Sequence, residues 1–170
     1  DLVVLDEAHH ARRKGAGTEQ EKGPNQLLTL MQKLAPRTKA LLLLTATPMQ
    51  VHPVEVYDLL ALLGMPDGWD QRVFLQYFEL AARNPGNDDL ALLARMFKAT
   101  EAAFGETTDG EVAVIAPDAS LVVREKVMHA LRHKGSLQLK RLEAEDRRVA
   151  LAVLRQVSPV RRLMSRHTRA

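Results

Sequence analysis

The sequence of 170 residues has no cysteine, and aromatic residues make up only 4% of it. Without cysteine, disulfide frameworks and thiolate zinc sites are excluded, and a reducing compartment, the cytoplasm, is expected. No apolar run approaches the roughly 18 residues that a membrane span requires, so no membrane partner is expected. Hydrophobic residues make up 46% and are mainly Leu, Val and Ala, a mixture that favours helices.

Charge is distributed unevenly along the chain, although the net charge is only +3. Residues 1–119 contain 11 Lys and Arg against 17 Asp and Glu, whereas residues 120–170 contain 13 against 4. A basic segment of this kind is typical of surfaces that bind polyanions such as nucleic acid. A solvated helix face rich in Arg has the same composition, so charge alone leaves both interpretations open.

The first ten residues combine an apolar run with two adjacent carboxylates. Leu2 to Leu5 are all apolar, which predicts a strand buried on both faces of a parallel sheet. Asp6 and Glu7 follow directly, and ligands of open α/β sheets bind at the carboxyl ends of the strands. The pair suits phosphoanhydride hydrolysis, because one carboxylate can hold Mg²⁺ through water while the next polarises the attacking water.

A second apolar run, Ala40 to Leu44, predicts a neighbouring strand. The helical pattern between the two runs begins after Asn25, so a βαβ unit with parallel strands is expected. Thr45, Ala46 and Thr47 follow the second strand, where the two hydroxyls can hydrogen-bond the acidic site. The glycine-containing segment 11–24 is expected to be a loop, either a basic loop at the ligand edge or a plain surface loop.

Beyond Pro48 the pattern is helical. Helices are expected at 53–63, 70–82 and 87–104, from Asp118 or Ser120 to Gly135, and at 136–157, with a loop at 107–117 that contains a short strand at Val112–Ile115. The predicted fold class is α/β, a partial parallel sheet with a predominantly helical remainder. Its expected parts are a βαβ part (1–52), a helical part (53–157) and a basic exit segment (158–170).

Two of these segments resemble motifs of a known family. Val4-Leu-Asp-Glu-Ala-His-His10 resembles the Walker B motif (motif II) of superfamily-two DEAH-type helicases, and Leu42-Leu-Leu-Thr-Ala-Thr-Pro-Met-Gln50 resembles their motif III. The form is similar to the Swi/Snf-like branch and nearest to its RapA-like translocases. The tail from Leu163 to Arg169 resembles the string with which such proteins leave their first RecA-like motor lobe.

The resemblance implies a role for each matching residue. Asp6 would hold Mg²⁺ through water, and Glu7 would be the catalytic residue that activates the hydrolytic water. His9 would link the ATP site to Thr45, Ala46 and Thr47, which couple hydrolysis to movement of nucleic acid. The implied cofactors are ATP and Mg²⁺.

The resemblance also implies partners. The first is nucleic acid, with DNA favoured over RNA, and Arg166 and Arg169 would lie near it or near the lobe junction. The others are the rest of the motor chain and RNA polymerase or another complex.

The sequence departs from the family in one important respect. No Gly-x-x-x-x-Gly-Lys-[Ser/Thr] phosphate loop occurs in the 170 residues, and they are expected to contain no second lobe. The chain begins at Asp1 and is therefore expected to be a fragment that does not hydrolyse ATP by itself.

Two other interpretations compete with this one. Glu7 and His10 have the Glu-x-x-His spacing of di-iron bundles, but no second copy of it and no His-Glu-x-x-His motif occurs, and His10 is explained as well by a polar strand terminus. The chain could also be a non-catalytic helical module that binds nucleic acid or protein through residues 120–170. Salt-dependent DNA binding by that segment, together with an upstream coding sequence that has no phosphate-loop motif, would favour this alternative.

Overall fold

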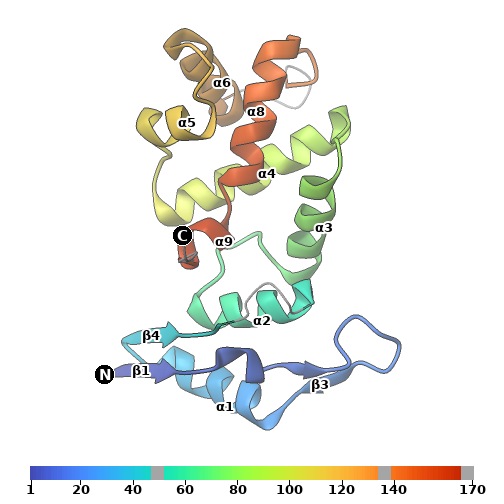
Figure 1. Ribbon diagram of the computed structural model, residues 1–170, viewed down its shortest axis with the longest axis vertical. Helices are drawn as coiled ribbons and strands as arrows, with labels where there is room; N and C mark the ends of the chain where they lie inside the picture. Colours follow the sequence, from blue (N-terminus) through green and yellow to red (C-terminus); the bar gives the residue numbers. More distant parts are fainter. Residues whose placement is uncertain (47–51, 134–138, 166–170) are drawn as a thin grey trace. The chain divides into compact units, whose positions relative to one another are not determined.

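The computed structural model describes residues 1–46, 52–133 and 139–165, and Figure 1 shows the elements along the chain. The chain forms two compact units, Asp1–Met65 and Pro66–Ala170. The first holds a small parallel sheet and the second is helical, so the fold is mixed α/β as predicted. The boundary follows Met65 rather than residue 52, because the helix that begins at Pro53 belongs to the first unit.

In the described residues of the first unit there are two pairs of strands and two α-helices. Its elements are β1 (Leu2–Leu5), the 3₁₀ turn η1 (Ala8–His10), β2 (Arg13–Lys14), β3 (Lys22–Pro24), α1 (Gln26–Leu34), the 3₁₀ turn η2 (Ala35–Arg37), β4 (Ala40–Leu43) and α2 (Pro53–Leu63). Strands β1 and β4 are parallel, with Leu2 opposite Ala40 and Leu5 opposite Leu43. The predicted strand–helix–strand arrangement is therefore confirmed.

The ends of the two helices follow from their capping residues. The side chain of Asn25 accepts a hydrogen bond from the backbone N–H of Leu28 at 2.8 Å, which satisfies a free donor of the first turn of α1. Pro53 stands in the first turn of α2, where its missing N–H costs nothing. Gly64 ends α2 with a φ of 96°, a value that side chains disfavour.

The two-stranded sheet is buried on one face only, which corrects the expectation that β1 is buried on both. Val3 and Leu5 of β1, with Leu41 and Leu43 of β4, pack against a core of four buried residues, Ala11, Leu28, Met31 and Leu62. The opposite face carries Leu2, Val4, Leu42 and Leu44, which are 63%, 51%, 47% and 43% exposed. The pleat sends alternate side chains to opposite faces, and this core contacts only one of them.

Segment 11–24 is a hairpin rather than the expected loop. Strands β2 and β3 pair antiparallel, with Lys14 opposite Lys22 and an irregular register beside them. The guanidinium of Arg13 makes two 2.7 Å hydrogen bonds to the buried carboxylate of Asp58 in α2. This double contact fixes the hairpin to α2, a long-range effect that local composition does not predict.

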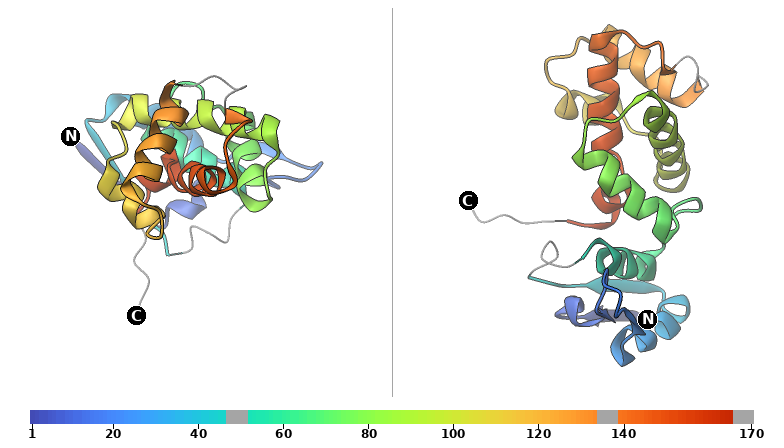
Figure 2. Two further views of the ribbon diagram at one scale, coloured as in Figure 1. Left: turned by 90° about the horizontal axis from the view of Figure 1, so that it is seen from above. Right: turned by 90° about the vertical axis from the view of Figure 1, so that its right-hand side faces the viewer.

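The second unit is built from helices. These are α3 (Gln71–Ala82), α4 (Asn87–Phe104), α5 (Asp109–Ile115), α6 (Leu121–His133), α8 (Ala144–Gln156) and α9 (Pro159–Leu163). Helices α6 and α8 pack along each other (Figure 2). The helices predicted at 70–82 and 87–104 are confirmed, and Asp70 caps α3 by accepting from the N–H of Val73.

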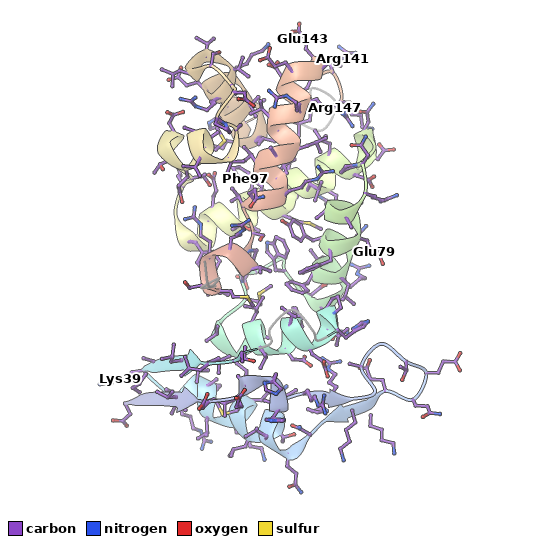
Figure 3. All side chains as sticks on the ribbon, viewed as in Figure 1. Lys39, Glu79, Phe97, Arg141, Glu143 and Arg147 are labelled. Carbon is purple, nitrogen blue, oxygen red and sulfur yellow. The ribbon has the colours of Figure 1, made fainter. Side chains whose placement is uncertain are left out.

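The core of the second unit is organised around a buried indole. Trp69 is 1% exposed, donates from Nε1 to the carbonyl of Met96 at 3.1 Å, and packs edge-on against the ring of Tyr77. The Tyr77 hydroxyl donates to the carbonyl of Arg155 at 2.6 Å and so joins α3 to α8. Phe97 of α4 lies inside the same unit (Figure 3). Few aromatic residues thus suffice because they are concentrated here.

Segment 109–115 is a helix, and the predicted strand at Val112–Ile115 is wrong. The hydroxyl of Thr108 accepts from the N–H of Glu111, and the carboxylate of Glu111 accepts from the N–H of Thr108. This capping box starts α5 and outweighs the strand preference of the valines in it. The motif Thr-x-x-Glu is present in the sequence and could have predicted the helix.

The predicted helix at 136–157 is shorter than expected. Helix α8 begins at Ala144, after a break at residues 140–143, and Figure 3 shows Arg141, Glu143 and Arg147 at its N-terminal end. Glu145 and Asp146 in the first turn stabilise a helix N-terminus, whereas cations such as Arg141 are unfavourable there. The change from basic to acidic residues at position 143 therefore marks the start of a helix. Residue 136 lies outside the described part of the chain.

Within the residues that the structure describes, no helix combines the length and apolar character of a membrane span.

Candidate functional site

The predicted acidic site and Thr45 lie at the same edge of the parallel sheet. Beyond the regular pairing of β1 with β4, the N–H of Leu44 donates to the carbonyl of Leu5 at 2.9 Å, and the N–H of Ala8 donates to the carbonyl of Leu44 at 2.8 Å. These two bonds clamp the chain on both sides of Asp6 and Glu7. The backbone therefore holds both carboxylates beside the carboxyl end of β4.

His9 connects the two strand ends. Its Nδ1 atom lies 3.2 Å from Oε2 of Glu7 and 3.1 Å from Oγ1 of Thr45. An Nδ1–H can donate to either oxygen, whereas a ring with its proton on Nε2 accepts from the threonine hydroxyl. One nitrogen thus serves two oxygens on neighbouring strands. Because both oxygens contact Nδ1, a displacement of the Glu7 carboxylate can move the His9 ring and so alter the contact of this ring with Thr45.

Glu7 has an unusual backbone conformation. With φ 50° and ψ 46° it is left-handed, and it is the one non-glycine residue of the described chain with a positive φ. Such a conformation costs about 1–2 kcal/mol for an L-residue. The carboxylate of Asp6 accepts from the N–H of Glu7 at 2.8 Å and so holds this conformation. Strain of this kind is often found at functional sites.

The exposed donors at this edge are carboxylates, which are ligands that a hard cation such as Mg²⁺ takes. Asp6 and Glu7 offer exposed carboxylate oxygens, and Mg²⁺ typically takes one or two carboxylates together with waters and phosphates. Among the described residues no three His, Asp or Glu side chains gather into a metal cluster. The ring of His10 stacks on that of His9 with centroids 4.2 Å apart. Glu7 and His10 therefore gain no third ligand for the Glu-x-x-His alternative.

The remaining predicted site residues divide into two groups. Ala46 follows Thr45 directly and is exposed. Thr47, Arg166 and Arg169 lie outside the described residues. The part of the predicted site that the structure brings together is therefore Asp6, Glu7, His9 and Thr45.

An ion pair of the first unit was missed by sequence reasoning. Asp58 of α2 is 4% exposed and holds Arg13, whose guanidinium also contacts Glu21 at 3.1 Å. The hydrogen bond to Asp58 is the main cause that raises the pKa of Arg13 above its ordinary value. A backbone hydrogen bond from Gly17 and the contact with Arg13 lower the pKa of Glu21. Arg13 and Asp58 are 45 positions apart in the sequence, so no local sequence pattern predicts that they pair.

Gly17 allows the loop of the hairpin to approach α2 closely. Its φ is 76°, and a Cβ atom there would collide with the imidazole of His52, which caps α2. Only glycine fits this position without displacing that ring. Arg13 therefore holds the hairpin to α2, and Gly17 lets the hairpin loop lie close to the residue that caps this helix.

Part of the positive charge of segment 120–170 is paired with carboxylates within the second unit. Five of its cations pair with carboxylates: Arg124 with Asp109, Lys126 with Asp146, Arg132 with Glu101, Lys140 with Asp88 and Arg162 with Glu111. Counted by folded unit, residues 1–65 contain 7 basic and 7 acidic residues, and residues 66–170 contain 17 and 14. Basic and acidic residues are therefore less unevenly distributed between the two folded units than along the sequence.

Comparison with known proteins adds no family to this description: no protein-family model matches the chain, and neither a curated protein nor a solved structure shows significant similarity to it.

Proposed function

We propose that this chain supplies the Walker B and motif III half of the first motor lobe of an ATP-dependent nucleic-acid translocase of the Swi/Snf-like, RapA-like kind. In this proposal Glu7 activates the hydrolytic water and Asp6 holds Mg²⁺ through water. His9, Thr45, Ala46 and Thr47 couple the nucleotide site to nucleic acid, and Arg166 and Arg169 lie toward the lobe junction.

The observation that carries the proposal is the shared Nδ1 of His9. It lies within 3.2 Å of the Glu7 carboxylate and 3.1 Å of the Thr45 hydroxyl, at the ends of two parallel strands. Motif strings can occur by chance in unrelated proteins. Their side chains meeting at the ligand-binding edge of a parallel sheet is a much more demanding condition.

The chemistry divides among a few groups. Bound Mg²⁺ supplies positive charge that stabilises the phosphoryl group during transfer. The Glu7 carboxylate is 53% exposed and can accept a proton from water. His9 orients that carboxylate and transmits its position to Thr45. Because the 170 residues contain no phosphate loop, the β- and γ-phosphates must be held by residues outside this chain.

The alternative function, a helical module that binds nucleic acid or protein through residues 120–170, has less support. Its main argument is the charge of that segment, and five of the cations are engaged with carboxylates of the same unit. Breaking such pairs to bind a polyanion would give up interactions that hold the unit together.

The test uses the complete polypeptide that contains these residues. We expect Mg²⁺-dependent ATP hydrolysis that DNA stimulates, and a loss of at least about a hundredfold in Glu7→Gln, the scale typical of general acid–base catalysis. Glu19→Gln is the matched control, because Glu19 is an exposed glutamate of the same unit that lies in the hairpin loop. Turnover that survives Glu7→Gln, or turnover by the 170 residues alone, would overturn the proposal.

A further inference from the structure

The hairpin of β2 and β3 places two like charges directly opposite each other. Lys14 and Lys22 are cross-strand partners, and both are exposed. Like charges in this position destabilise a hairpin. An anion bound between the two ammonium groups would offset their repulsion and so stabilise the hairpin.

Neither lysine is neutralised by the described part of the chain. No carboxylate there lies within 4.0 Å of either ammonium group, in contrast to the neighbouring Arg13, which holds Asp58 and Glu21. Glu21 is the acidic residue next to Lys22, and its oxygens already accept from Arg13 and from the N–H of Gly17. The positive charge of Lys14 and Lys22 therefore faces solvent.

The two lysines line one hollow. This hollow has a volume of about 750 Å³, and Gly23, Asn25 and Gln26 also border it. Apart from its two chain neighbours, no atom lies within 4 Å of the position that a Cβ of Gly23 would occupy, so the space beside Gly23 is open. The Gln26 amide adds a polar group to the rim. Pro24 and Leu27 complete the border, so the hollow has both polar and apolar sides.

We propose that the hollow between Lys14 and Lys22 binds the phosphodiester backbone of a nucleic acid. A site for a single free phosphate would need converging, desolvated donors, whereas here two exposed, flexible ammonium groups border a wide surface. This suits a repeating polyanion that releases counterions on binding. The inference rests on the proposed function for the class of partner and extends it, because it assigns a backbone contact on the hairpin rather than on motif III or the lobe junction.

The experiment measures binding of a fluorescent DNA duplex to the 170-residue chain by anisotropy over a series of salt concentrations. We expect the double substitution Lys14→Gln and Lys22→Gln to weaken binding about tenfold and to reduce the slope of log K against log salt by about 1.8, or about 0.9 per lost phosphate contact. The matched control is Lys33→Gln with Lys39→Gln, which removes the same charge from exposed positions of the same unit. Circular dichroism establishes that each variant is folded.

Three results would overturn the inference. The control pair could reduce affinity as much as the hollow pair, which would indicate a response to net charge only. The salt slope could stay unchanged in the hollow variant. Alternatively, inorganic phosphate at low millimolar concentration could displace the DNA fully, which would indicate a site for a free anion.

This outcome is separable from that of the proposed function. The complete polypeptide could fail to hydrolyse ATP while the substitutions at Lys14 and Lys22 still weaken DNA binding. In that case the proposed function is wrong, and the contact of the two lysines with the phosphodiester backbone stands. If hydrolysis depends on Glu7 and the lysines have no effect on binding, the backbone contact is wrong and the proposed function stands.

Discussion

Nδ1 of His9 lies 3.1 Å from Oγ1 of Thr45 and links the ends of β1 and β4. We expect this contact to contribute about 0.5–1.5 kcal/mol, the net value of a typical hydrogen bond. A double-mutant cycle of His9→Ala and Thr45→Val measures it through hydrogen exchange at the amides of Ala8 and Leu44, which close the sheet at this edge. The parallel cycle of His10→Ala with Thr45→Val should give a smaller coupling, because His10 reaches Thr45 only through its contact with the His9 ring, and equal coupling in both cycles would contradict the assignment.

The left-handed backbone of Glu7 predicts that glycine is more stable than alanine at this position. Glu7→Gly should stabilise the first unit by up to about 1 kcal/mol relative to Glu7→Ala, because both variants lose the carboxylate and only alanine retains the steric cost of a positive φ. Urea unfolding followed by far-UV circular dichroism compares the two. An alanine variant as stable as the glycine variant would show that position 7 is unstrained.

The pairing of Arg132 with Glu101 predicts a large cost when the guanidinium is removed. Glu101 is 9% exposed and accepts two 2.8 Å hydrogen bonds from Arg132. Arg132→Met should cost roughly 3–5 kcal/mol, because it leaves a buried carboxylate without its partner. Trp69 fluorescence reports unfolding of this unit. The control Lys140→Met breaks a pair with the exposed Asp88 and should change stability little.

The same pair predicts a dependence of stability on pH. Burial acts to raise the pKa of Glu101, but hydrogen bonds from Arg132 and Thr107 outweigh it and lower the pKa below the ordinary value of 4.5. The unfolded state therefore binds the proton more readily. The stabilisation is complete above about pH 4.5 and is lost as the pH falls through the lower folded pKa. Glu101→Gln should flatten the acid limb of a stability profile, and an unchanged limb would contradict this assignment.

The capping box of α5 predicts a moderate and specific effect. Thr108→Ala removes the hydroxyl that accepts from the N–H of Glu111 and should cost about 1 kcal/mol, the usual value of an N-cap. Thr108→Ser retains the hydroxyl and should be nearly neutral. Thermal unfolding of the second unit, followed by Trp69 fluorescence, distinguishes the two variants. An alanine variant as stable as the serine variant would show that the cap contributes nothing.

Local chemistry predicts the elements that carry their own start and stop residues. Asn25, Asp70 and Gly64 cap helices where the sequence places them, since each acts on backbone groups within a few positions. The strand predicted around Val112 is wrong because β-branched residues indicate a strand only where no capping box such as that of Thr108 precedes them. The exposure of Leu2 could not be predicted, because an apolar run does not say how many faces its sheet has covered.

The candidate site was predictable in part for the same reason. The placement of Asp6 and Glu7 at a strand end followed from the apolar run before them, and the meeting of His9 with Thr45 required only that the two strands be neighbours. The hydrogen bonds between Arg13 and Asp58 depend on tertiary packing. The position of Lys14 opposite Lys22 depends on the register of the hairpin. Neither leaves a periodic trace in the sequence.

The ion pairs of the second unit also bear on how the chain is made. In three ion pairs of this unit the carboxylate leaves the ribosome before its cation. These pairs are Asp88 with Lys140, Glu101 with Arg132 and Asp109 with Arg124. Until α6 and the residues leading into α8 have emerged, the nascent helices before them carry unpaired acidic groups. The second unit should thus complete its folding only after residue 140 has left the ribosome, whereas the first, whose Arg13–Asp58 pair is complete by residue 58, can fold before the second unit is synthesised.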